Sequence, residues 1–181
     1  MAAVCVYCSS SDSIDAAYLQ LASAVGARLA AGGHSLISGG GRVSMMGELA
    51  RAARSGGART VGVIPAQLVS REMADHDADE LLVVDTMRER KRLMEEKSDA
   101  FLALPGGIGT LEELFEIWTS GSLGMHAKPV LVLDPDGFYA PMWDYLDRLC
   151  ARGFVRRAAL DLLHRVTSVE EAFVAVESAL R

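Results

Sequence analysis

The amino-acid sequence predicts an α/β fold, a doubly wound parallel sheet in a single domain that spans residues 1–181. Short apolar runs alternate with amphipathic segments, which is the pattern of βαβ units. Glycine- or serine-rich stretches follow several of the apolar runs, as expected where parallel strands turn into helices. The 181 residues are 50% hydrophobic, which suits one domain with one sizeable core.

The first half of the chain alternates between the two element types. The apolar run 2–8 predicts a strand, and the amphipathic stretch 14–31 predicts a helix that stops at Gly32-Gly33. The run 35–37 predicts a second strand, and 44–55 a helix that stops at Gly56-Gly57. The run 59–64 predicts a third strand, which Pro65 ends. The polar, acidic stretch 66–80 predicts a long loop with a short helical turn.

The second half continues this alternation. Apolar runs at 81–84, 100–104 and 129–133 predict three more strands, and a last strand is expected near 164–166. The stretch 86–97 predicts a helix with Thr86 as its N-cap, and 111–119 predicts the next helix. Most of the chain after 133 is predicted to be helical. In such sheets ligands bind beyond the carboxyl ends of the strands, where the loops 9–11, 39–41 and 106–110 fall.

Composition excludes several classes of protein. A net charge of -6 argues against a nucleic-acid binder that relies on a basic surface, although a local positive pocket could still hold a small anion. No apolar run approaches the ~20 residues of a membrane span, and no signal peptide is visible. Three cysteines do not suggest a disulfide framework. We therefore expect a cytoplasmic protein that binds neither nucleic acid nor membrane.

No metal or cofactor is predicted. Cys5 and Cys8 have CxxC spacing, but side chains three apart on a strand point to opposite faces, which favours two core residues. His76 lies among aspartates without a fixed ligand set, so an exposed acidic loop is expected at 75–79. Neither Lys91 nor Lys128 has the context of a pyridoxal-phosphate lysine.

The glycine-rich loop after the run 100–104 is the first candidate binding element. Glycine lets the backbone approach a ligand closely, and the first amides of a helix are unpaired donors that favour an anion. The Thr110 hydroxyl could add a bond or simply cap the helix. A tight turn without a ligand remains the alternative. The residues of this element are Gly106, Gly107, Ile108, Gly109 and Thr110.

Two further loops could line the binding site of the same ligand. Gly39-Gly40-Gly41 leads into Met45-Met46-Gly47 at another predicted strand–helix junction. The alternatives are a tight turn and a second backbone wall, with Gly40 and Gly41 against the ligand. Ser9 follows the first predicted strand at the same edge of the sheet.

Arg90 is the candidate cation. Met87, Arg90 and Met94 are spaced i, i+3 and i+7, so they share one helical face. The surrounding charges read as a solvated surface, but an arginine between two methionines on a core-facing stripe is expected to reach into a cleft. Its planar fork suits a phosphate or a carboxylate.

Glu112 and Glu113 begin the helix after the glycine-rich loop. Carboxylates in a first turn interact favourably with the helix dipole, so capping is one explanation. Adjacent helical positions diverge by about 100°, so at least one of the two could face the ligand. There it could accept a ribose hydroxyl, orient water or stabilise a cationic sugar.

These segments together resemble the LOG family of cytokinin riboside 5′-monophosphate phosphoribohydrolases, long labelled lysine decarboxylases. Residues 105–113 are similar to the family's PGGxGTxxE signature, and 39–47 to its GGGxxGxMG segment. Residues 86–91 are similar to its Met-x-x-Arg-Lys element, and 123–129 to LGxHxKP. The matches cover nearly the whole chain in order.

The resemblance implies a Rossmann-like fold and a homodimer that needs no cofactor. It implies hydrolysis of the N-glycosidic bond of AMP or N6-isopentenyl-AMP, releasing free base and ribose 5-phosphate. Arg90 and Glu113 would be the catalytic pair. The implied nucleotide contacts are Glu72, Arg90, Lys91, Gly106, Gly107, Ile108, Gly109, Thr110, Leu111, Glu112 and Thr119.

The chain departs from the family pattern at three places. Ser44 stands where glycine is usual, Arg88 where histidine is common, and the acidic stretch 75–79 replaces a Thr-Gly-Glu type of segment. None of these touches the implied catalytic pair. They bear on substrate preference, so AMP and N6-isopentenyl-AMP both remain candidate substrates.

The mechanism expected from these residues passes through an oxocarbenium-like sugar. The phosphate would bind the helix N-terminus after the glycine-rich loop and hold C1′ in place. Glu113 would stabilise the developing charge and position water, and Arg90 would fix Glu113 and contact substrate oxygens. No residue identifies itself as the proton donor to the base. A non-catalytic nucleotide or molybdenum-cofactor carrier and a phosphate-releasing nucleotidase are the competing hypotheses.

Overall fold

One parallel sheet organises the molecule in the computed structural model, which describes residues 1–180 and leaves only Arg181 of the predicted domain outside. Its strands are β1 Ala3–Tyr7, β2 Ser35–Ser38, β3 Thr60–Pro65, β4 Glu80–Val84, β5 Ala100–Ala103, β6 Val130–Leu133 and β7 Leu163–Val166. They lie in the order β4-β3-β2-β1-β5-β6-β7, and every pairing is parallel. The predicted doubly wound sheet is confirmed, with its change of winding direction between β1 and β5.

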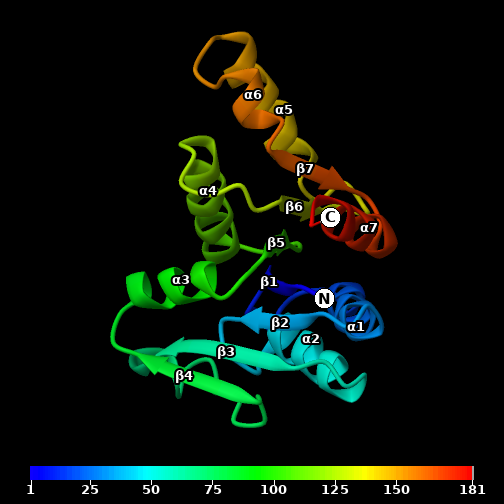
Figure 1. Ribbon diagram of the computed structural model, residues 1–181, viewed down its shortest axis with the longest axis vertical. Coiled ribbons are helices and arrows are strands. Elements are labelled where there is room, and N and C mark those ends of the chain that lie inside the picture. Colours follow the sequence, from blue (N-terminus) through cyan, green and yellow to red (C-terminus); the bar gives the residue numbers. More distant parts are fainter. Residues whose placement is uncertain (181) are drawn as a thin grey trace.

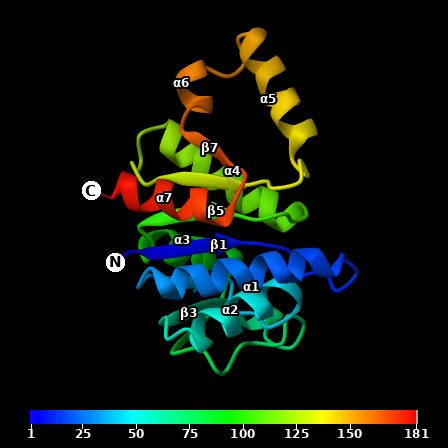
Figure 2. The ribbon, with the colours of Figure 1, turned by 90° about the vertical axis from the view of Figure 1, so that its right-hand side faces the viewer.

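Helices cover both faces of the sheet. They are α1 Ala16–Ala31, α2 Ser44–Ser55, α3 Met87–Glu96, α4 Ile108–Ser122, α5 Ala140–Ala151, α6 Arg157–Leu160 and α7 Val169–Ala179, with a 3₁₀ turn, η1, at Ala66–Leu68. Figure 1 shows α1, α2 and α7 on one side of the sheet and α3 and α4 on the other. Figure 2 looks onto the first of these layers, with α5 and α6 projecting beyond it.

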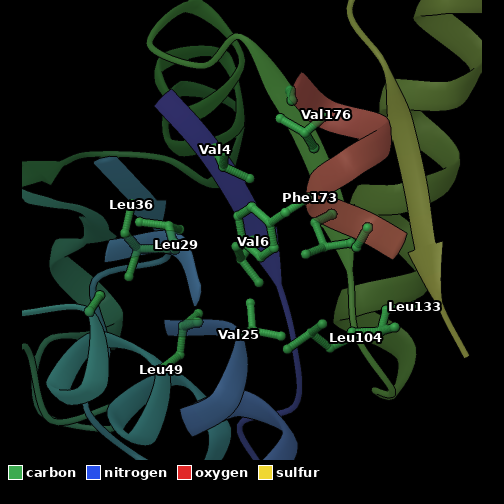
Figure 3. Close-up of a cluster of buried hydrophobic side chains, with 14 of the residues drawn as sticks. Val4, Val6, Val25, Leu29, Leu36, Leu49, Leu104, Leu133, Phe173 and Val176 are labelled. Atoms are coloured by element: carbon green, nitrogen blue, oxygen red, sulfur yellow. The ribbon is translucent and has the colours of Figure 1, made fainter. Parts of the chain in front are cut away.

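The alternation of side chains along β1 divides the core into two clusters. Val4 and Val6 face the α1, α2 and α7 layer, where they pack with Val25 and Phe173 (Figure 3). Cys5 and Tyr7 face the α3 and α4 layer. Cys8 packs against the first cluster instead, so both cysteines are free thiols on opposite sides of the sheet, as the spacing predicted.

Helix ends follow local capping chemistry. Thr86 is the N-cap of α3, as predicted, and its Oγ1 accepts the Glu89 N–H at 3.1 Å. The first helix begins two residues later than predicted, because Asp15 caps α1 by accepting the Ala17 N–H at 2.8 Å. The helix predicted over 111–119 is longer, Ile108–Ser122, so Gly109 lies inside its first turn.

The loop that follows η1 is less open than the sequence indicated. Its prediction as an exposed acidic loop is wrong for Asp75, which is buried and paired with Arg54. Both carboxylate oxygens of Asp75 accept bonds from Arg54, at 2.7 and 3.2 Å. A backbone bridge between Gly41 and Ala74 ties the same loop to the end of β2. The loop is therefore fixed on the sheet.

Close packing of α1 on α2 depends on Gly26. A β-carbon at this position would lie 2.4 Å from the Leu49 carbonyl oxygen and 2.9 Å from the Ala52 β-carbon. Such contacts require the two helix backbones to separate. Glycine thus allows an approach that no other residue permits.

Replacing Gly26 by alanine should lower the free energy of unfolding by about 1–3 kcal/mol, because overpacking outweighs the gain in helix propensity. Urea denaturation measures the change. Gly109→Ala is the matched control, because a β-carbon at Gly109 has no neighbour within 4 Å. That variant should be as stable as the wild type or more so. Equal or increased stability of Gly26→Ala would contradict the packing argument.

Candidate active site

The guanidinium of Arg90 is buried at the carboxyl edge of the sheet. The residue is 6% exposed and Met94, one turn later, is 1% exposed, so the predicted inward face of α3 exists. Met87 differs from the prediction. It is exposed at the edge of the site, where its Sδ accepts a bond from Arg90 Nη1 at 3.8 Å. Arg90 therefore reaches into a cleft, as the sequence indicated.

Arg90 is incompletely paired. Its Nη2 lies 3.6 Å from Oε2 of Glu72. Within the described residues, neither this oxygen nor Arg90 Nε has a hydrogen-bond partner, although both atoms are buried. Leaving a buried polar atom unpaired is costly, and in native structures such atoms call for a functional explanation. A bound ligand would supply the missing partner.

Glu72 is held beside Arg90 by the anchored loop. The Arg42 N–H donates to the Glu72 carbonyl oxygen at 3.1 Å, and the Asp75 N–H donates to the Gly40 carbonyl oxygen at 2.8 Å. Together with the Arg54–Asp75 ion pair, these bonds fix the backbone on both sides of Glu72. These contacts give Glu72 a defined position, although the polar loop that contains it shows no sequence periodicity.

Glu113 supplies the second carboxylate of the site from α4. Desolvation raises the pKa of its carboxyl to about 7, while the positive charge of Arg90 acts in the opposite direction. The negative charges of Glu112 and Glu72 add to the increase. Near neutral pH the carboxyl therefore exists in both protonation states, which is typical of groups that take part in catalysis.

The N-terminus of α4 is open to a ligand. Leu111 donates the first intrahelical bond, to the Gly107 carbonyl oxygen at 3.0 Å, so the preceding amides have no partner within the helix. In the described part of the chain no side chain caps this end, so Thr110 does not serve as a cap. Around Gly107 and Gly109 a β-carbon would meet nothing within 4 Å. Neither position has a positive φ, so neither the backbone nor the neighbours require glycine there.

A cavity of about 250 Å³ joins these features. It brings together most of the residues that the sequence proposed. They are Ser9, Glu72, Arg90, Gly107, Ile108, Gly109, Thr110, Glu112 and Glu113. The cavity lies across the ends of β1, β2 and the β5–α4 loop, where this topology places a ligand.

Other lining residues were missed by the sequence analysis. Gly39 belongs to the glycine run that was noted, but only its two successors were selected. Tyr7 and Met46 read as core residues, and nothing in their spacing distinguishes them from the core. The additional lining residues include Tyr7, Cys8, Gly39, Met46, Leu68, Met87 and Met94.

Six of the proposed residues do not line this cavity. The ammonium of Lys91 is paired with Glu112 and Glu116, on a neighbouring cavity of about 290 Å³ that Glu113 also lines. Thr119 is exposed in the last part of α4. The other four residues are also outside the lining of this cavity. They are Gly40, Gly41, Gly106 and Leu111.

Two features are absent from residues 1–180. No group of three or more His, Cys, Asp or Glu side chains in this range could hold a metal ion. No helix in the same range has the length and apolar character needed to cross a membrane.

The chain is similar to known proteins over most of its length. Residues 46–176 match the family model described as possible lysine decarboxylase. A Mycobacterium tuberculosis protein named cytokinin riboside 5′-monophosphate phosphoribohydrolase is 52% identical, covering 93% of this chain and 90% of that protein. A rice protein (Oryza sativa subsp. japonica) named cytokinin riboside 5′-monophosphate phosphoribohydrolase LOG is 39% identical, covering 96% and 72% of the two chains.

Solved structures share the fold. A molybdenum cofactor carrier protein from Chlamydomonas reinhardtii aligns with a TM-score of 0.75 at 21% identity, covering 98% of this chain and 97% of that one. At this identity the likeness concerns the Rossmann-like architecture alone. The family-model match spans residues 46–176, a range that contains α3, the glycine-rich loop and α4. By the family model and by its relatives, this chain belongs to the LOG family.

Proposed function

We propose that this protein hydrolyses the N-glycosidic bond of an adenosine 5′-monophosphate, with or without an N6 substituent, and releases the free base and ribose 5-phosphate. One observation carries the proposal. The buried, incompletely paired Arg90 and the desolvated Glu113 share a cavity with the uncapped N-terminus of α4. The names of the Mycobacterium and rice relatives support the same activity.

The N-terminus of α4 is the proposed phosphate site. Its free amides and the helix dipole favour an anion, and the open space at Gly107 and Gly109 lets phosphate oxygens approach the backbone. Glycine in a helix costs about 1 kcal/mol relative to alanine, so Gly109 calls for a compensating role. Contact with the phosphate would provide it.

The sugar would then lie between Glu113 and Arg90. The ionised form of Glu113 stabilises the positive charge that develops on the ribose and positions the attacking water. Arg90 holds substrate oxygens and balances the negative charge of Glu113. Glu72, Ser9, Ile108, Thr110 and Glu112 are the proposed further contacts along the cavity wall. The anchored phosphate holds C1′ in line with this pair.

The proposed site requires no cofactor. A pyridoxal-phosphate decarboxylase would need one of the three lysines of the chain, and one of them, Lys97, pairs with Glu80 at 3.2 Å and lies outside the cavity. The other two are Lys91 and Lys128. Lys91 is paired with Glu112 and Glu116, and Lys128 Nζ donates to the Glu95 carbonyl oxygen at 2.7 Å. Neither side chain lines the cavity that holds Arg90 and Glu113. This placement favours hydrolysis over decarboxylation.

A homodimer is the assembly that we propose. Leu123 and Met125, which follow α4, are 65% and 72% exposed. Exposed apolar side chains of this kind suit contact with a second copy of the chain. Sedimentation equilibrium should give twice the mass of one chain, and a monomeric mass at micromolar concentration would contradict the proposal.

Product analysis tests the function. The purified protein should convert AMP or N6-isopentenyl-AMP into free base and ribose 5-phosphate. Release of inorganic phosphate would instead indicate a nucleotidase. Bound but unchanged nucleotide would indicate a carrier. Comparing the two substrates at equal concentration also gives their relative kcat/KM, and therefore the preference between them.

The catalytic pair yields a direct prediction. Glu113→Gln and Arg90→Ala should each lower the rate of base release by about 10²-fold or more, since each removes a charged group from the reacting centre. Arg92→Ala is the matched control, because Arg92 is exposed on the same helix and its ion pair among residues 1–180 is with the exposed Glu96. Circular dichroism should show that all three variants are folded. Near-normal turnover in Glu113→Gln or Arg90→Ala would refute the assigned roles.

Gly109→Ala should weaken substrate binding without lowering the stability of the protein. The β-carbon enters open space in the free protein, so the free energy of unfolding should stay level or rise by up to about 1 kcal/mol. The same methyl group would occupy the space proposed for the phosphate, so KM for AMP should rise about 10-fold or more. Steady-state kinetics and urea denaturation measure the two effects. An unchanged KM would place the phosphate elsewhere.

A further inference from the structure

We propose that Gly39 is a positioning residue: the absence of a side chain there sets the place of the Arg90 guanidinium and thereby the rate of glycosidic bond cleavage. The inference rests on the proposed function, because it assigns a kinetic effect to a residue that supplies no chemical group. Gly39 directly follows β2 and lines the cavity together with Arg90.

The two residues are in direct contact. A β-carbon at Gly39 would lie 1.9 Å from Arg90 Nη2, 2.9 Å from Cζ and 3.3 Å from Nε. These three atoms are the nearest to that position, and all belong to the guanidinium. The charged group therefore lies against the α-carbon of Gly39 and fills the space in which any other residue would carry its side chain.

The backbone gives no separate reason for glycine at this position. Gly40 has a φ of +74°, which favours glycine, whereas Gly39 is not among the residues with positive φ. An alanine at 39 can adopt the local conformation, and its methyl group would meet no backbone atom before it meets Arg90. The adjustment must therefore come from a long, flexible side chain, and the strand can stay in place.

Moving the guanidinium would change its contacts with Glu72 and Met87. Its Nη2 faces Glu72 at 3.6 Å, and its Nη1 donates to the Met87 sulfur at 3.8 Å. A methyl group at Gly39 would drive it away from this position and change where its fork points. Misplacing a catalytic group by about 1 Å can cost about 100-fold in rate. The amides of α4 lie on another element, so phosphate binding should change far less.

The test compares Gly39→Ala with the wild type in kinetics and in a crystal structure. We expect kcat for base release to fall about 100-fold, KM for AMP to change less than about 3-fold, and the urea midpoint to stay unchanged. The crystal structure should show the Arg90 guanidinium displaced. Ser35→Ala, at the opposite end of β2, is the control and should leave all of these quantities unchanged.

Two results would overturn the inference. One is a guanidinium that keeps its place beside the new methyl group, and the other is a displaced guanidinium with wild-type kcat. A fall in kcat that is accompanied by loss of folded protein would likewise contradict it, since the role would then be structural. Failure of the proposed function gives a different result, because the wild type itself would release no base while the crystal structure still reports the contact between Gly39 and Arg90.

Discussion

The arrangement of the whole site depends on the buried guanidinium of Arg90. A charge removed from water must be paired, and within residues 1–180 the pairing is incomplete, since Nε has no hydrogen-bond partner there and Oε2 of Glu72 lies 3.6 Å from Nη2. The chain leaves space for the guanidinium at Gly39 and holds Glu72 near it with a fixed loop. A buried cation that its own chain pairs only in part can still accept contacts from substrate oxygens.

The fold brings these groups together from distant parts of the chain. Arg90 and Glu113 lie on α3 and α4, which cover the same face of the sheet (Figure 1). The cavity that both residues line lies at the carboxyl ends of β1 and β2 and at the β5–α4 loop. The far ends of the two helices are tied by the segment after α4. The His126 ring bonds to the Ile117 carbonyl oxygen at 2.8 Å, and Lys128 Nζ donates to the Glu95 carbonyl oxygen. These bonds give the LGxHxKP-like segment a structural role in holding the two helices.

Sequence reasoning recovered the features that local patterns encode. Short apolar runs predicted the strands of a doubly wound sheet, and an arginine on an apolar helical face predicted a side chain that reaches into a cleft. Glu72 came from family resemblance alone, because the polar loop around it has no periodicity. The start of α4 was placed three residues late, since glycines at 107 and 109 read as loop. The contact between Gly39 and Arg90 depends on tertiary packing, which no local pattern reports.

The most direct test of the central claim is a crystal structure of the Glu113→Gln variant with AMP. Glutamine preserves the shape of the side chain while removing the charge, so the nucleotide should remain intact. The account predicts the phosphate on the amides at the start of α4 and C1′ of the ribose between Arg90 and Gln at position 113. A phosphate bound elsewhere, or a ribose outside the cavity that Arg90 lines, would contradict it.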